Sequence, residues 1–113
     1  MVAHQVVDAG AIFSDPLALR ILGVDADAVR RKIDAADDAR RRLRLFIAMR
    51  SRIAEDALAA AATRGVSQYV VLGAGLDTYA YRSPFAERLT VFEVDHPMTQ
   101  RWKRDQLERA DIG

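Results

Sequence analysis

The sequence contains no cysteine, and it has only two histidines and three prolines among 113 residues. The absence of cysteine excludes disulfide bonds, thiolate catalysis and cysteine-ligated metal sites in this sequence. With His4 and His96 as the only imidazoles, a dedicated zinc site is not expected. We expect both histidines to be surface or capping residues rather than catalysts.

The sequence also lacks a long hydrophobic run and an excess of charge of one sign. The formal net charge of +1 gives no general attraction for nucleic acid or for an anionic membrane. The most apolar stretch, residues 57–75, is interrupted by Arg64, Gly65 and Gln68 and is too broken to span a bilayer. Residues 1–10 lack the basic region ahead of an apolar run that marks a signal peptide. We therefore expect a cytoplasmic protein with no nucleic-acid or membrane partner.

Half of the residues are hydrophobic and 29% are charged, a composition typical of a globular domain. Residues 1–36 are expected to form an N-terminal helical segment. Within it, a short helix begins around Asp15 and ends at Gly23, and Asp25 or Asp27 caps a second one.

Residues 37–113 alternate between helical and strand patterns. The expected elements are a helix over 38–64, a strand over 68–72, a short helical segment over 77–82, a strand over 89–95 and a helix from 97 to about 110. This order indicates an α/β fold with a parallel sheet and right-handed crossovers. The first strand is apolar from Tyr69 onward, so we expect it to be covered on both faces.

The long helix carries an apolar stripe with one charged residue inside it. The stripe, whose members recur at three- and four-residue intervals, consists of Leu43, Phe46, Ile47, Ile53, Ala54, Ala57, Leu58 and Ala61. We expect other elements to cover it, which would bury Arg50 but not Arg52. If the helix packs antiparallel to the first strand, Arg50 lies level with Gly73 and can bind a ligand carboxylate bidentately. An internal ion pair with Asp77 or Glu93, or a side chain extending into solvent, remains the alternative.

The first strand runs into the glycine turn Gly73-Ala74-Gly75. Glycines at the carboxyl end of such a strand let a ligand approach the backbone without meeting a Cβ. Glu93 and Asp95 follow at the end of the second strand, about 20 residues later, where acids accept hydrogen bonds from ribose hydroxyls. The pattern favours a nucleoside-containing cofactor over a glycine turn used for packing alone.

The residues after the turn bear on which nucleoside is bound. The dinucleotide fingerprint requires a third small residue where a pyrophosphate meets a helix N-terminus, and Thr78 stands there. Asp77 directly before it would repel a pyrophosphate but can accept a hydrogen bond from an amine. S-adenosyl-L-methionine therefore fits better than NAD, although an NAD-type half-domain remains the alternative.

Three segments together resemble one protein family. The segment "RSRIAEDALAAAATRGVSQYVVLGAGLDTYAYR", then "LTVFEVDHP" and Lys103, is similar to the N-terminal part of the S-adenosylmethionine-dependent methyltransferases related to leucine carboxyl methyltransferase. The bacterial branch abundant in actinomycetes is included. The resemblance covers residues 48–103, and it implies the N-terminal portion of a Rossmann-like class I methyltransferase fold, helices followed by parallel β-α-β-α, with residues 37–113 as the start of the cofactor-binding domain.

The resemblance also implies roles for single residues. Arg50 matches the arginine that binds the cofactor carboxylate, Asp95 matches the ribose-binding acid, and Arg82 is expected to form a structural ion pair. The cofactor-binding residues that it implies are Arg50, Gly73, Gly75, Asp77, Glu93 and Asp95.

Members of this family have much longer chains, so we expect this one to be a fragment or a truncated form. The acceptor, a small molecule or a peptide methylated on a carboxylate or hydroxyl oxygen, would bind outside these residues, and no general base can be assigned. A sheet of two strands leaves unpaired edges that favour self-association. A non-enzymatic remnant that self-associates is therefore a further alternative.

Overall fold

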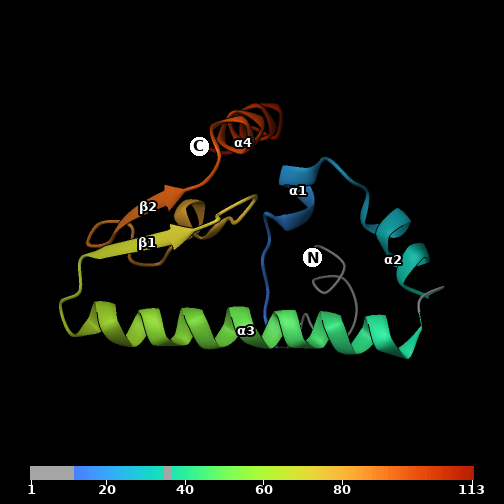
Figure 1. Cartoon of the computed structure of the whole chain (residues 1–113), viewed down its shortest axis with the longest axis horizontal. Helices are drawn as coiled ribbons and strands as arrows, with labels where there is room; N and C mark the ends of the chain where they lie inside the picture. Colours follow the sequence, from blue (N-terminus) through green and yellow to red (C-terminus); the bar gives the residue numbers. More distant parts are fainter. Residues whose placement is uncertain (1–11, 35–36) are drawn as a thin grey trace. The chain divides into compact units, whose positions relative to one another are not determined.

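The computed structural model describes residues 12–34 and 37–113. The chain divides into two compact units, Met1–Ala57 and Leu58–Gly113 (Figure 1). The predicted boundary at residues 36–37 adjoins residues that are not described, and it stays a prediction. The expectations for His4 and for the first eleven residues also lie outside the described residues.

The first unit contains two short helices, α1 (Ala18–Leu22) and α2 (Ala26–Asp34). Before α1, Asp15 Oδ1 accepts a hydrogen bond of 2.9 Å from the Leu17 backbone N–H. Gly23 ends α1 in the left-handed conformation, with φ of 64°. Asp25 Oδ2 accepts a hydrogen bond of 3.1 Å from the Ala28 backbone N–H in the first turn of α2. Both predicted helices are confirmed, and capping explains the end of α1 at Gly23 and the start of α2 at Asp25.

The long helix α3, Asp38–Thr63, belongs in part to each unit. Asp37 Oδ1 accepts a hydrogen bond of 2.9 Å from the Arg40 N–H and so caps its first turn. In the first unit, Phe13 packs with Ala48, which is fully buried, and Leu45 packs against this cluster.

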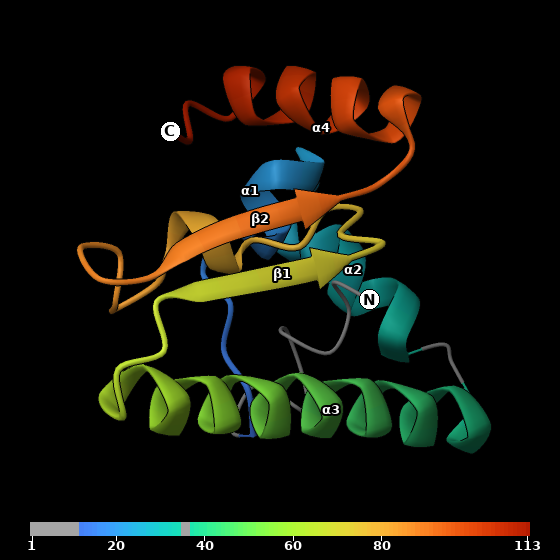
Figure 2. The same cartoon turned by 60° about the vertical axis from the view of Figure 1, so that its left-hand side comes forward.

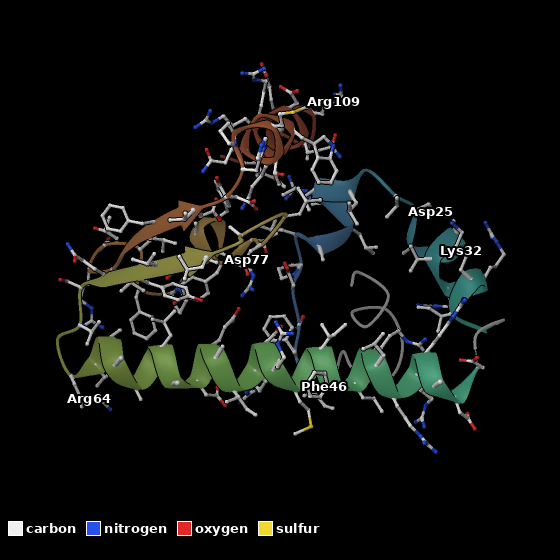
Figure 3. All side chains as sticks on the ribbon, in the orientation of Figure 1. Asp25, Lys32, Phe46, Arg64, Asp77 and Arg109 are labelled. Carbon is white, nitrogen blue, oxygen red and sulfur yellow. The ribbon has the colours of Figure 1, made fainter. Side chains whose placement is uncertain are left out.

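The expectation that the predicted apolar stripe of α3 is covered is wrong for the described residues. Phe46 is 60% exposed and Ile53 63%, and Phe46 is labelled on α3 in Figure 3. Arg50, in the middle of the stripe, is exposed as well, so the predicted burial of its guanidinium is also wrong. The physical reason is that α3 carries apolar residues on more than one side, and the side with Leu45 and Ala48 packs against Phe13.

The second unit is built on two parallel strands, β1 (Gln68–Leu72) and β2 (Thr90–Val94), which lie side by side in Figure 2. Their register pairs Val70 with Phe92 and Leu72 with Val94. The predicted strands and their parallel pairing are confirmed. The connection between them is less helical than expected, because it contains only one 3₁₀ turn, η3 (Tyr79–Tyr81).

Helix α4, Pro97–Arg109, follows β2. His96 is its N-cap, and Nδ1 of this histidine accepts a hydrogen bond of 3.1 Å from the Met98 N–H. The prediction that His96 is a capping residue is therefore confirmed. None of the helices in the described part of the chain combines the length and the apolar character needed to cross a membrane.

The two faces of the sheet differ in burial. Tyr69 and Glu93 are partly buried, and the Tyr79 ring meets the Tyr69 ring edge-on at 5.5 Å between centroids. The alternate positions are exposed: Val70 53%, Leu72 77%, Phe92 46% and Val94 50%. The expectation of a strand covered on both faces is wrong for the described residues, because within this unit side chains such as Tyr79 pack on one face only.

Candidate cofactor-binding site

The glycine turn directly follows β1 and is joined to the end of β2. Gly73 and Gly75 have positive φ values of 65° and 52°. The Gly73 N–H donates to the Val94 carbonyl at 2.7 Å, and the Asp77 N–H donates to the Ala74 carbonyl at 2.8 Å. The turn is therefore a hydrogen-bonded structure in which glycine is required for its backbone conformation.

The turn also presents bare backbone to open space. A Cβ added to Gly73 or Gly75 would meet no atom within 4 Å, leaving aside neighbouring residues in the chain. Among the described residues, close packing therefore does not explain these glycines. The open space leaves room for a ligand to approach the turn, although Gly23 and Gly65 are equally open.

Asp95 stands just beyond β2, beside this turn. Its Oδ2 accepts a hydrogen bond of 2.7 Å from the Gly75 N–H, and its Oδ1 accepts one of 2.7 Å from the His96 N–H. The hydrogen bond from Gly75, followed by that from His96, lowers the pKa of Asp95. The group is therefore an anion at neutral pH. Each carboxylate oxygen has further acceptor capacity, so Asp95 can also accept from ligand hydroxyls.

Asp77 lies two residues after Gly75 and forms hydrogen bonds at the end of the turn. It is labelled in Figure 3 in the loop after β1. Its Oδ1 accepts a hydrogen bond of 2.9 Å from the Tyr79 N–H, which fixes the start of η3. Its backbone carbonyl accepts from Lys103 Nζ at 2.5 Å. Both interactions order the loop at the carboxyl end of β1.

Glu93 lies within β2 and pairs with Lys103 of α4. The distance between Glu93 Oε2 and Lys103 Nζ is 2.5 Å, and the two side chains are 19% and 5% exposed. Lys103 Nζ also lies 5.6 Å from the centroid of the Tyr81 ring. Burial, and then the charge of Glu93, raise the pKa of Tyr81.

Sequence reasoning did not assign a role to Lys103, although it belongs to the pattern on which the resemblance rests. A signal was present in its spacing. Lys103 stands four residues before Leu107 on α4, and both are buried, at 4% and 7% exposure. A lysine on the apolar side of an amphipathic helix requires an internal partner.

The structure brings five of the six predicted site residues into one unit, Leu58–Gly113: Gly73, Gly75, Asp77, Glu93 and Asp95. Arg50 belongs to the other unit. Its part in the site therefore stays a prediction. No group of three or more histidine, aspartate or glutamate side chains within residues 12–34 and 37–113 is arranged to hold a metal ion.

Comparison with known proteins places this chain in a family. The family model described as leucine carboxyl methyltransferase matches residues 1–113. The chain belongs to the leucine carboxyl methyltransferase family. This membership confirms the resemblance seen in the sequence. Together with the parallel β1–β2 pair, it supports an α/β fold that is part of a Rossmann-like methyltransferase.

Curated proteins are also similar to this chain in sequence. A protein of Mycobacterium sp. (strain KMS) is 38% identical over 99 residues, which cover 88% of this chain and 37% of the relative. One of Mycobacterium marinum is 40% identical over 98 residues, 80% of this chain and 32% of the relative. YktD of Bacillus subtilis is 55% identical over 49 residues, 42% of this chain and 16% of the relative. All three are provisionally named S-adenosyl-L-methionine-dependent methyltransferases.

This family member spans only 37% of the length of the first of these relatives. Its residues therefore correspond to a part of such a protein. The candidate site consists of the glycine turn and the acid that follows β2.

The residues after the turn differ from a dinucleotide-binding fingerprint in structure as well as in sequence. Thr78 is 2% exposed, and its Oγ1 accepts a hydrogen bond of 2.9 Å from Arg82 Nε. The Arg82 guanidinium carbon lies 5.7 Å from the centroid of the Tyr79 ring. The printed contacts of Arg82 are thus with a hydroxyl and a ring, and its expected structural ion pair stays a prediction. The three-residue η3, rather than an α-helix, follows the turn in the described part of the chain.

Proposed function

We propose that this chain contributes the first half of a binding site for S-adenosyl-L-methionine. The observation that carries the proposal is the open glycine turn whose Gly75 N–H is held by Asp95 at 2.7 Å. Family membership and the names of the relatives support the choice of cofactor.

The described residues fit this cofactor by their chemistry. The bare backbone at Gly73 and Gly75 lets it approach, and the Asp95 carboxylate accepts from the ribose hydroxyls. Asp77 supplies negative charge for the amine of the methionine part, and Arg50 binds its carboxylate. In these roles the chain binds and orients the cofactor, and the bound cofactor itself supplies the activated methyl group.

We propose further that the whole protein is an enzyme that transfers this methyl group to an oxygen atom, a carboxylate or a hydroxyl, of a small molecule or a peptide. His96 is used as a helix cap, and the carboxylates beside the glycine turn are assigned to the turn and to the cofactor, so we assign no general base among the described residues. We propose that residues outside this chain select the acceptor.

A non-enzymatic property also has an observation in its favour. We propose that the chain self-associates through its sheet, because β1 and β2 pair only with each other among the described residues. Unpaired parallel edges are templates for pairing with another chain. The exposed side chains of Val70 and Phe92 also leave one face of the sheet apolar.

Calorimetry with S-adenosyl-L-methionine and S-adenosylhomocysteine tests the cofactor proposal. The chain should bind both, Asp95→Ala should weaken binding by about tenfold or more, and Arg50→Ala should weaken it likewise. Arg42→Ala is the matched control, since Arg42 is an exposed arginine on the same helix, and it should bind normally. NAD should not compete. Binding of NAD with loss of response to S-adenosyl-L-methionine would overturn the assignment.

A further inference from the structure

Lys103 is a buried cation with three partners in the second unit, two from the β1–β2 connection and one from β2. Its side chain is 5% exposed, and its Nζ donates to the Asp77 carbonyl and to Glu93 Oε2, each at 2.5 Å. The Tyr81 ring lies beside it, 5.6 Å from centroid to Nζ. A buried ammonium is costly unless several partners satisfy it. Here a turn carbonyl, a strand carboxylate and an aromatic ring do so together.

The partners of Lys103 flank the two halves of the candidate site. Asp77 is two residues after Gly75, and Glu93 is two residues before Asp95. Lys103 therefore links the loop that carries Gly75 to the strand that leads to Asp95. The hydrogen bond between Gly75 and Asp95, 2.7 Å long, is a direct contact between these same two segments, as is the bond from the Gly73 N–H to the Val94 carbonyl.

We propose that Lys103 is a positioning residue for the cofactor site. By holding the Asp77 carbonyl and the Glu93 carboxylate on one ammonium group, it fixes the glycine turn against the end of β2. The distance between the Gly75 backbone and the Asp95 carboxylate then suits a ligand that contacts both. This inference rests on the proposed binding of S-adenosyl-L-methionine, and it assigns Glu93 an indirect part in that binding.

The geometry distinguishes this role from that of an ordinary core residue. Lys103 makes its two short contacts with residues on both sides of the turn, at sequence separations of 26 and 10 residues. Asp77 offers its backbone carbonyl, so the position of the loop itself is held. Loss of the ammonium therefore frees the loop while the β1–β2 hydrogen-bond ladder remains.

Amide hydrogen exchange of the ligand-free chain, followed by NMR, tests this directly. In Lys103→Met, the amides of Gly75 and Asp77 should exchange about tenfold faster or more, whereas the amide of Val71 in the strand ladder should change less. Arg101→Met removes an exposed cation from the same helix and should change neither. Turn and strand amides that accelerate equally would overturn the inference, because that result describes general destabilisation.

A second variant keeps the test informative if Lys103→Met does not fold. Lys103→Met leaves the Glu93 carboxylate without its ammonium, and that penalty alone can unfold a small chain. The double variant Glu93→Gln with Lys103→Met removes both charges. It still lacks the donor for the Asp77 carbonyl, so the Asp77 amide should remain faster than in the wild type. Wild-type exchange in the double variant would overturn the inference.

Calorimetry measures whether Lys103 also affects the affinity for S-adenosyl-L-methionine. For folded variants, Lys103→Met should raise the Kd for S-adenosyl-L-methionine by about 10- to 100-fold at unchanged stoichiometry, and Arg101→Met should not. Normal affinity in Lys103→Met overturns the positioning role and leaves the proposed function intact. Absence of binding by the wild type instead refutes the proposed function, and the exchange experiment then decides by itself whether Lys103 holds the turn.

Discussion

The Asp95 carboxylate accepts a hydrogen bond of 2.7 Å from the backbone N–H of Gly75, twenty residues earlier in the chain. The contact joins the ends of two neighbouring parallel strands at the edge where ligands bind in open α/β sheets. It also depends on the charge of Asp95, since hydrogen bonds from backbone N–H groups are strongest to an ionised carboxylate.

The lowered pKa of Asp95 predicts how stability depends on pH. Because the folded-state pKa lies below that of the unfolded chain, the contribution is fully present above about pH 3.9, the ordinary aspartate value, and is lost as the pH falls through the folded-state value. Thermal unfolding of wild type and Asp95→Asn, measured from pH 7 downward, checks this. The stability difference between them should shrink below about pH 4. A difference that stays constant across this range contradicts the prediction.

Replacement of Gly73 by alanine should reduce both stability and cofactor binding. The left-handed conformation of Gly73, with φ of 65°, costs a residue with a Cβ about 1–2 kcal/mol. The new Cβ would also project into the open space where the ligand approaches. Chemical denaturation and calorimetry with S-adenosyl-L-methionine measure the two effects.

Gly23→Ala is the matched control for this substitution. Gly23 ends α1 with φ of 64°, and an added Cβ there also meets no atom within 4 Å. It should lose a similar amount of stability and keep its affinity for the cofactor. Equal loss of affinity in both variants would mean that backbone strain, and not the ligand, explains the result at Gly73.

Tyr81 should titrate at higher pH than an ordinary tyrosine. Burial and the charge of Glu93 raise its pKa, whereas the usual value is about 10. Because the pKa is higher in the folded state, the free energy of unfolding should fall as the pH rises from the ordinary tyrosine pKa through the raised value. Below the ordinary pKa the contribution of the neutral phenol is fully present. Absorbance at alkaline pH measures the tyrosinate, and the difference between wild type and Tyr81→Phe isolates this group. Glu93→Gln should move the Tyr81 transition towards lower pH, and an unchanged midpoint would exclude the assigned electrostatic cause.

The elements of the fold could be predicted from the sequence wherever local chemistry decides them. Asp15, Asp37 and His96 act at helix starts, and Gly23 at a helix end, as their residue types indicate. The helical segment at 77–82 was overestimated. There the Asp77 side chain and the buried Thr78 fix a single 3₁₀ turn, and such loop geometry is set by tertiary contacts.

The candidate site was predictable where backbone requirements leave a sequence pattern. The glycines of the turn and the acid at the end of β2 have this property, and the structure links Gly75 to Asp95. Burial was less predictable, because it depends on which partner packs against a surface. Arg50 and Phe46 share an apolar stripe, yet both are exposed. Lys103 was missed as a structural centre because its partners, Asp77 and Glu93, come from elements distant in sequence.

Self-association through the sheet should depend on concentration and should be removed by a charge on an exposed strand position. Val70 lies in the middle of β1 and is 53% exposed, so Val70→Lys costs little burial while it places a lysine where strand pairing would have to accommodate it. Sedimentation velocity over a range of concentrations should show oligomers for the wild type and mainly monomer for Val70→Lys.

Gln68→Lys, at the exposed start of the same strand, controls for added charge and should reduce association less. A wild type that stays monomeric at every concentration would contradict the proposed self-association and would leave the cofactor proposal untouched, because the glycine turn and Asp95 are positioned within one unit of a single chain.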